Sequence, residues 1–175
     1  IDLDAQMNLT HSLVGDVGEN AMTITECIFD SKLPLKNVIQ ATQVRDVDLA
    51  PAGESMINLE LKLHSELGRE HKLKRVLESV RSDYDYILLD NPPHLGLTTV
   101  NSLVASDYFL VPVSTEYLPM VGIKHLIKTI DQIRPLNEKL KNAGYLLTMM
   151  DRREGIAKDV EAVLRSSFGN EVFKT

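Results

Sequence analysis

The sequence predicts an α/β fold with three layers, in which a mostly parallel sheet is flanked by helices on both faces. Short apolar runs alternate with helical patterns along the 175 residues, as in sheets whose strands are joined by helices. A hydrophobic fraction of 43% with 25% charged residues is typical of a soluble globular protein. No internal repeat, low-complexity tract or linker-like change of composition interrupts the pattern. We therefore expect one continuous domain over residues 1–175.

Four apolar runs have the length and composition of buried parallel strands. They span residues 47–52, 86–90, 108–113 and 145–150. Between and after them, apolar residues recur with the spacing of helices that bury one face. Those helical positions are Leu73, Val76, Leu77 and Val80, then Leu126, Ile127, Ile130 and Ile133, and finally Ile156, Val160, Val163, Leu164 and Phe168. Residues 20–46 are less regular, with a helix expected near residues 25–29 and a new segment beginning at Pro34.

Acidic residues follow the predicted strands, and this predicts the position of a functional site. In such sheets, ligands bind at the carboxyl ends of the strands. Asp2, Asp4, Asp90, Glu116 and Asp151 all lie at or just after the end of a predicted strand. We expect the chemistry of the protein at that edge.

The most specific local pattern is the segment 84–93, an apolar strand that ends in Asp90 and continues with Asn91, Pro92 and Pro93. It has the form of a Walker B strand, whose carboxylate holds Mg²⁺ through its water shell in P-loop nucleotidases. The prolines cannot continue a strand and therefore fix its end. The alternative interpretation is an acid that only accepts hydrogen bonds from the following turn.

A second pattern is the segment 2–8, which places Asp2, Asp4, Gln6 and Asn8 at alternating positions. An extended chain presents such residues on one side. Phosphoryl transfer depends on positioning the attacking water and on neutralising charge, so Asp4 is the candidate for orienting that water. Asp and Asn are also frequent in turns without a catalytic role, and a polar turn remains the alternative.

Together these segments resemble the ParA/Soj/MinD group of P-loop ATPases, and most closely its ParA/Soj partition proteins. The resemblance covers nearly the whole chain, in the order expected for the family. Residues 2–10 resemble switch I, residues 84–96 resemble Walker B with switch II, residues 97–103 resemble the helix that follows, and residues 110–117 and 147–153 resemble later segments.

The resemblance implies an ATPase that binds ATP and Mg²⁺ and forms a homodimer around two ATP molecules. It implies non-specific DNA binding in the ATP state and stimulation by a ParB-like, centromere-binding partner, without a membrane. By matching position, Asp4 would orient water, Asp2 would lie near the metal and phosphates, and Asp90 would hold Mg²⁺. Three residues would lie near the adenine, and two more would contribute to the dimer face. The first set is Thr148, Met149 and Asp151, and the second is Glu116 and Tyr117.

The sequence departs from the family in lacking a phosphate-binding loop. None of its 9 glycines belongs to a glycine-rich segment followed by Lys and Ser/Thr at the required spacing. In the family this loop precedes the segment that matches Asp2–Asp4. We therefore expect a chain truncated at both ends, which exposes apolar sheet edges and does not bind ATP tightly by itself. Smaller departures are Ala5, Met7 and Asn91, where the family has proline, a small residue and cysteine or threonine.

The net charge of −6 excludes a protein that coats DNA through bulk positive charge, so any DNA contact must be local. Basic residues near the C-terminal end could contribute, although a solvated helix face is the preferred interpretation. They are Arg152, Arg153, Lys158, Arg165 and Lys174. Cys27 is the single cysteine, which favours a reducing compartment and a core position. The resemblance implies a cytoplasmic protein that associates with the nucleoid.

Two other interpretations remain open. One is a non-catalytic relative that dimerises or binds a partner without hydrolysing ATP. The other is a MinD-like positioning ATPase, which shares the Walker B form but would need a C-terminal amphipathic helix.

Overall fold

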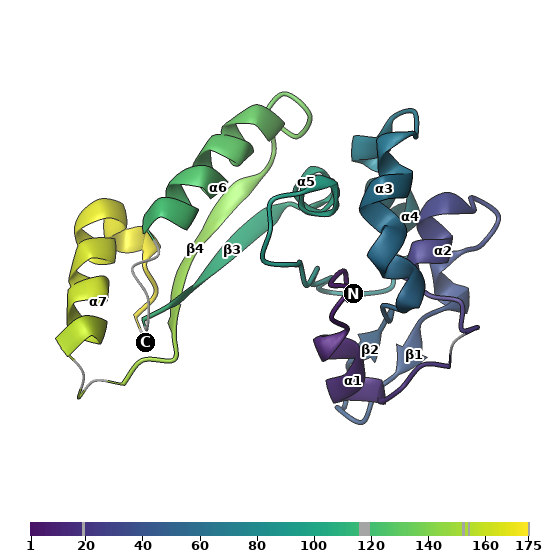
Figure 1. Ribbon diagram of the computed structural model, residues 1–175, viewed down its shortest axis with the longest axis horizontal. Helices are drawn as coiled ribbons and strands as arrows, with labels where there is room; N and C mark the ends of the chain where they lie inside the picture. Colours follow the sequence, from purple (N-terminus) through teal and green to yellow (C-terminus); the bar gives the residue numbers. More distant parts are fainter. Residues whose placement is uncertain (19, 116–119, 152, 154, 175) are drawn as a thin grey trace. The chain divides into compact units, whose positions relative to one another are not determined.

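The computed structural model describes residues 1–18, 20–115, 120–151, 153 and 155–174. It contains two compact units, Ile1–Ala105 and Ser106–Thr175, and each is considered by itself. The α/β class predicted from the sequence is confirmed, because helices alternate with strands and the longest strand pair is parallel (Figure 1). That residues 1–175 form one domain stays a prediction.

The first unit consists of short helices around extended segments (Figure 1). Its α-helices are α1 (Asn8–Val14), α2 (Ile24–Phe29), α3 (Leu59–His64), α4 (Lys72–Glu78) and α5 (Leu97–Ala105). Its strands are β1 (Gln40–Ala41) and β2 (Asp48–Leu49), and its 3₁₀ turns are η1 (Leu35–Asn37), η2 (Glu54–Asn58) and η3 (Arg69–His71). The expected helix near residues 25–29 and the new segment at Pro34, which precedes η1, are both found.

The chain start lies between two other extended segments of this unit. The Asp2 backbone N–H donates to the Ala50 carbonyl (3.1 Å). On the other side Asp2 and Asp90 form a parallel bridge, in which the Leu3 N–H donates to the Asp90 carbonyl (2.9 Å). The Asp90 N–H donates in turn to the Ile1 carbonyl (2.9 Å). Parallel pairing thus brings the carboxyl ends of both acidic segments to one edge.

Two of the four predicted strands are therefore less regular than expected. Within residues 47–52 only β2 is a strand, and it pairs antiparallel with β1. Pro51 has no N–H with which to continue a ladder. Of residues 86–90 only Asp90 forms a bridge, to Asp2, and the segment lacks the burial on both faces that was predicted for it. Tyr86 and Leu88 are 86% and 79% exposed, because no described part of the first unit covers that face.

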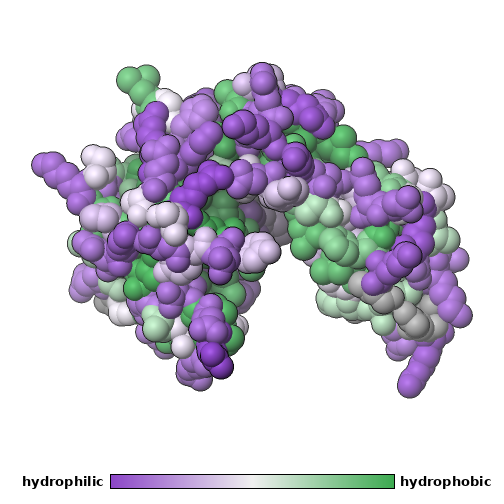
Figure 2. Space-filling view, turned by 180° about the vertical axis from the view of Figure 1, so that it is seen from behind, coloured by the Kyte–Doolittle hydropathy of each residue, from purple (hydrophilic) through white to green (hydrophobic). Residues whose placement is uncertain are grey.

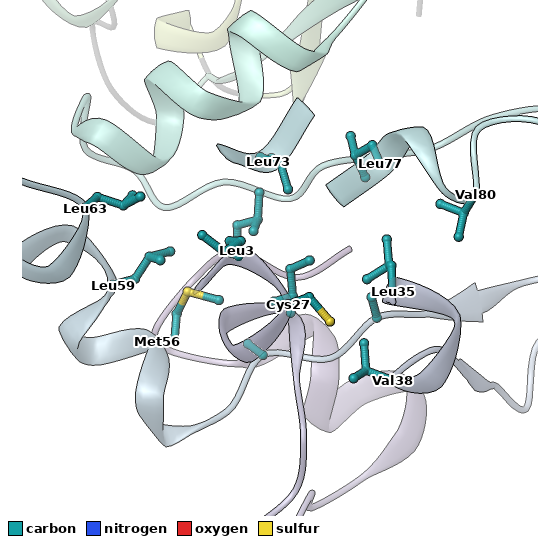
Figure 3. Close-up of a cluster of buried hydrophobic side chains, with 14 residues drawn as sticks. Leu3, Cys27, Leu35, Val38, Met56, Leu59, Leu63, Leu73, Leu77 and Val80 are labelled. Atoms are coloured by element: carbon teal, nitrogen blue, oxygen red, sulfur yellow. The ribbon is translucent and has the colours of Figure 1, made fainter. Parts of the chain in front are cut away.

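The core of the first unit packs the helices against the extended segments (Figure 3). Leu3 lies at its centre and is 2% exposed. The helix predicted around Leu73 and Leu77 is α4, and both side chains enter this core, as does Val80 just beyond it. Cys27 is buried on α2, as the sequence predicts.

The second unit contains the parallel pair β3 (Tyr108–Ser114) and β4 (Lys141–Thr148), connected through α6 (Met120–Ile133). Helix α7 (Gly155–Phe168) and the turn η4 (Gly169–Glu171) follow, and Val172 then bridges to Tyr145 as a third parallel segment. This order confirms the predicted strand 108–113, and the strand predicted at 145–150 is found as β4, which begins earlier and ends at Thr148 because Met149 adopts a left-handed conformation. The Tyr145 and Phe168 rings stack with centroids 4.1 Å apart.

The predicted apolar faces of α6 and α7 are buried only in part. Ile130, Val160 and Leu164 are buried, whereas Ile156 and Val163 are 47% and 38% exposed. Figure 2 shows apolar side chains at the surface among polar ones. Among the described residues, no helix is long and apolar enough to cross a membrane.

Candidate functional site

Asp2 is completely buried and all its polar contacts are made inside the first unit. Its Oδ1 accepts the backbone N–H of Asp4 (3.0 Å). Its Oδ2 accepts the backbone N–H of Thr10 (2.9 Å) and the Thr10 hydroxyl (2.7 Å). Three donors around one carboxylate satisfy an anion that burial would otherwise strongly destabilise.

Asp4 lies in the turn that follows Asp2 and is partly exposed. Its Oδ1 accepts the N–H of Gln6 (3.0 Å), and its carbonyl accepts the N–H of Met7 (3.0 Å). Met7 has φ 54°, a left-handed conformation that reverses the chain just before α1. Asp4 Oδ2 makes no hydrogen bond within the described part of the chain. The turn therefore fixes the backbone of Asp4 while leaving one carboxylate oxygen accessible.

Asp90 is exposed at the end of the neighbouring segment. Partial removal of solvent from its carboxyl group, followed by the negative charges of Asp2 and Asp4, raises the pKa of that group above the usual value for Asp. The next residue, Asn91, donates from Nδ2 to the Leu89 carbonyl (2.9 Å). Its Oδ1 is buried and has no hydrogen-bond partner among the described residues. This edge thus gathers negative charge and leaves an acceptor unused, both of which suit a hydrated cation.

The segment after Asp90 is anchored where it enters α5. Glu60, on α3, accepts the backbone N–H of Thr98 at its Oε1 (3.1 Å), in the first turn of α5. His94 Nε2 lies 3.6 Å from the same oxygen. A Cβ on Gly96 would overlap Oε1 and would lie 2.6 Å from Cδ and Oε2, so glycine is required for this contact.

The remaining predicted site residues belong to the second unit, at the end of β4. Thr148 accepts the N–H of Thr115 at its carbonyl (3.2 Å), and the Thr115 hydroxyl donates to the Met149 carbonyl (2.9 Å). Met149 has φ 54° and is 65% exposed. Asp151 is exposed, and its Oδ1 accepts the N–H of Arg153 (2.9 Å). Thr115, which is 1% exposed, thus holds the chain reversal that presents the Met149 side chain.

Some residues predicted to contact the dimer partner or DNA lie outside the described part of the chain, and one of the basic residues binds a neighbouring side chain. Glu116, Tyr117 and Arg152 lie outside the described residues. Arg165 binds Glu161 Oε1 through Nε (2.7 Å) and the Phe173 carbonyl through Nη2 (3.1 Å). Its guanidinium therefore supports the C-terminal segment, which favours a structural interpretation for this member of the basic set.

Sequence reasoning did not single out Thr10, Glu60 or Thr115. Thr10 belongs to the segment that resembles switch I, so the resemblance could have directed attention to it. Glu60 contacts residues more than thirty positions away, and no local pattern marks it. The same holds for the pairing of Thr115 with Met149.

Comparisons of sequence and fold with known proteins identify relatives of the chain. A family model described as "AAA domain" matches residues 1–142. The chain is 36% identical to the sporulation initiation inhibitor protein Soj of Bacillus subtilis over 179 aligned residues, covering 100% of this chain and 69% of that protein. It is 35% identical to the chromosome partitioning protein ParA of Myxococcus xanthus, covering 99% of this chain and 62% of that relative.

Solved structures share the fold. Cobyrinic acid a,c-diamide synthase from Mycobacterium smegmatis, with a bound ATP analogue and magnesium, has a TM-score of 0.88 at 30% identity over 96% of this chain and 68% of that one. A plasmid partition protein from Borrelia burgdorferi has a TM-score of 0.79 at 21% identity, over 98% of this chain and 72% of that one, and supports the fold alone. The matches to Soj and ParA extend through both acidic segments. The chain belongs to the ParA/Soj family of P-loop ATPases.

Proposed function

We propose that the protein is a DNA-partitioning ATPase in which Asp4 orients the attacking water and Asp90 holds Mg²⁺ through water. The observation that supports this most directly is the placement of two accessible carboxylates, Asp4 and Asp90, beside the fully buried Asp2. An accessible carboxylate can bind water or a hydrated ion, whereas a buried and saturated one cannot. The names of the relatives support the partition function, and the local geometry supports the assignment of roles.

The residues around Asp90 fit magnesium. Mg²⁺ prefers oxygen ligands, keeps several waters and uses one or two carboxylates rather than a cage of protein ligands. Asp90 supplies a carboxylate and Asn91 Oδ1 supplies a buried acceptor for a coordinated water. No group of three or more His, Cys, Asp or Glu in the described residues is arranged to hold a metal by itself. When bound, Mg²⁺ would neutralise charge on the phosphate oxygens.

Electrostatics favour a cation here for a second reason. The raised pKa of Asp90 reports that burial and the neighbouring Asp2 and Asp4 charges disfavour its ionised form. A nearby cation favours the ionised form of Asp90 and is itself attracted by the negative charges that surround it. Asp4, with Oδ2 accessible, can accept a hydrogen bond from a water and thereby hold it in line for attack.

The adenine site is proposed at the end of β4. Thr148, Met149 and Asp151 lie where the chain leaves the sheet, and Thr115 holds that reversal through two hydrogen bonds. An exposed Met side chain offers a flexible apolar surface for a base. The M. smegmatis synthase, whose structure contains an ATP analogue and magnesium, supports nucleotide binding in this fold. Because the 175 residues contain no phosphate-binding loop, the proposal concerns the full-length gene product.

Dimerisation, DNA binding and stimulation by a ParB-like partner complete the proposal, with action at the nucleoid. The support is the family, since a relative is named as a chromosome partitioning protein. With a net charge of −6, we expect DNA contacts to be few and local. The affinity of the ATP-bound protein for non-specific duplex DNA should fall with added salt, with a small slope in a log–log plot.

The test compares Asp4→Ala, Asp90→Ala and Asp16→Ala in the full-length protein. Asp16 is a control carboxylate with a side chain 98% exposed, paired with His11 at 3.3 Å. We expect Asp4→Ala to lose at least about 100-fold in ATP turnover but to keep ATP-dependent dimerisation. Asp90→Ala should lose both, and Asp16→Ala neither.

Turnover of Asp4→Ala equal to that of wild type would remove Asp4 from the mechanism. A wild-type protein that dimerises without any ATP hydrolysis would instead support the non-catalytic interpretation. Nucleotide-dependent binding to anionic lipid vesicles in place of DNA would support a MinD-like positioning ATPase.

A further inference from the structure

The three acidic residues of the site differ in what their carboxylates can still do. Asp4 and Asp90 are accessible, whereas both oxygens of Asp2 are occupied by donors from its own unit. A new ligand at Asp2 would have to displace the Thr10 or the Asp4 N–H. Asp2 therefore cannot touch water, metal or phosphate in this arrangement, although it is central to the segment that carries Asp4.

Thr10 connects Asp2 to a third segment. Its hydroxyl donates to Asp2 Oδ2 (2.7 Å) and accepts the backbone N–H of Ala52 (3.0 Å). Both Thr10 and Ala52 are 0% exposed, so no water can replace either bond. Because the hydroxyl acts as donor and acceptor together, its orientation is fixed. The backbone of Asp2 is bound to the same region, through its N–H to the Ala50 carbonyl (3.1 Å).

The same contacts fix the start of α1. The residue before this helix, Met7, provides no side-chain cap. Asp2 Oδ2 takes that role by accepting the Thr10 N–H in the first turn (2.9 Å). Asp2 thus holds the turn at both ends, with Oδ1 on the Asp4 N–H and Oδ2 on α1.

We propose that Thr10 and Asp2 form a positioning pair, in which the Thr10 hydroxyl locks the Asp2 carboxylate and thereby sets the place and direction of the Asp4 carboxylate. Asp2 is then a positioning residue and not a catalytic one. The inference rests on the proposed water-orienting role of Asp4. Catalytic groups must be held within a fraction of an ångström, so a loosened turn lowers the rate of the chemical step more than it weakens nucleotide binding.

The experiment uses full-length protein and three substitutions on α1. Thr10→Val keeps the shape and removes the hydroxyl, Thr10→Ser keeps the hydroxyl, and Ser12→Ala is the control. Ser12 is an exposed hydroxyl on the same helix that donates to the Asn8 carbonyl (2.7 Å). For each protein we would measure kcat and KM for Mg-ATP, ATP-dependent dimerisation and the melting temperature.

We expect Thr10→Val to lower kcat by about 10- to 100-fold while KM and dimerisation change less than about twofold. Thr10→Ser should retain kcat within about threefold, and Ser12→Ala should match wild type. Unchanged kcat in Thr10→Val would overturn the proposal. So would a loss of kcat that is matched by an equal loss of ATP binding, because a purely structural role moves both together.

Two further arms keep the result interpretable. If Thr10→Val does not fold, Thr10→Cys replaces it, since a thiol has similar volume and forms weaker hydrogen bonds. There we expect kcat to fall at least about threefold at constant KM, and an unchanged kcat would refute the pair. Asp4→Ala in the same assay separates the two proposals. If it abolishes turnover while Thr10→Val leaves kcat unchanged, the positioning pair alone fails. If Asp4→Ala retains turnover, the proposed function fails together with the pair.

Discussion

The contact between Glu60 and Gly96 permits a quantitative prediction about the segment that follows Asp90. In Gly96→Ala the new methyl group would occupy the position of the Glu60 carboxylate, since the three atoms nearest to an added Cβ are Oε1, Cδ and Oε2 of that side chain. Glu60 is flexible and can move away. It would then lose the hydrogen bond from the Thr98 N–H (3.1 Å) at the start of α5.

The magnitude follows from that lost bond. A hydrogen bond to a charged group contributes about 1.5–3 kcal/mol, and the Glu60 side chain is 35% exposed, which favours the low end. We expect Gly96→Ala to destabilise the protein by about 1–2 kcal/mol. In a Glu60→Ala background the carboxylate is already absent. There the same change should stabilise by about 0.4–1 kcal/mol, because alanine reduces the entropy of the unfolded chain and Gly96 does not need a positive φ.

The assay is a double-mutant cycle in urea, with Gly18→Ala as the control because nothing lies within 4 Å of a Cβ at that position. The control should shift the free energy of unfolding by less than about 0.5 kcal/mol in both backgrounds. If Gly96→Ala destabilises equally with and without Glu60, the methyl group meets something else and the reasoning is refuted. A reversal of sign would identify Glu60 as the anchor of this segment.

Three other outcomes are expected. Gly144→Ala should destabilise by about 3 kcal/mol or more, measured by urea unfolding, because Gly144 has φ +135° and a Cβ would lie 2.6 Å from the Glu171 carbonyl oxygen. The control Gly155→Ala should not destabilise the protein, because nothing lies within 4 Å of a Cβ at that position. Asp90→Asn should raise the melting temperature at pH 7 but not near pH 3. The pKa of Asp90 is higher in the folded than in the unfolded protein. Ionisation of this carboxyl group therefore lowers the stability as pH rises from the unfolded-state pKa through the folded-state pKa. An equal effect at both pH values would contradict this. Burial, then the charge of Glu26, raises the pKa of the Cys27 thiol to about 11, so native protein should resist iodoacetamide at pH 8 until it unfolds. Rapid labelling of the native protein would contradict that burial.

Sequence periodicity predicted those elements that contain enough apolar residues to define a buried face. Strands β3 and β4 and helices α4, α6 and α7 were all predicted, because each carries enough apolar residues to define a face. Helices α1 and α3 were missed. They are 7 and 6 residues long, and α1 depends on a cap from Asp2, which precedes the helix by several residues. Short helices with remote caps leave no periodic signal.

The predicted strand at residues 86–90 shows a different limit. An apolar run predicts an extended segment but does not say which faces will be covered. The side facing the core, including Ile87 and Leu89, packs as expected, whereas Tyr86 and Leu88 are exposed. The pairing partner, Ile1–Leu3, lies more than eighty residues away, so only the three-dimensional structure identifies it.

The acidic residues show why residue type alone could not assign roles within the candidate site. In sequence, Asp2 and Asp4 are equivalent, because each is an aspartate in an alternating polar segment after a strand. The structure separates them by their hydrogen bonds: three donors occupy Asp2, and Asp4 keeps one oxygen accessible. An aspartate that is saturated and buried stabilises one geometry of the chain, whereas a partly free one can bind a ligand. The pattern Asp2–Leu3–Asp4 then places the stabilising and the ligand-binding aspartate two residues apart. The strand alternation that buries Leu3 in the core also fixes the backbone that carries both carboxylates. A substitution at Leu3 should therefore disturb Asp4 through Asp2, although the Leu3 side chain has no polar group.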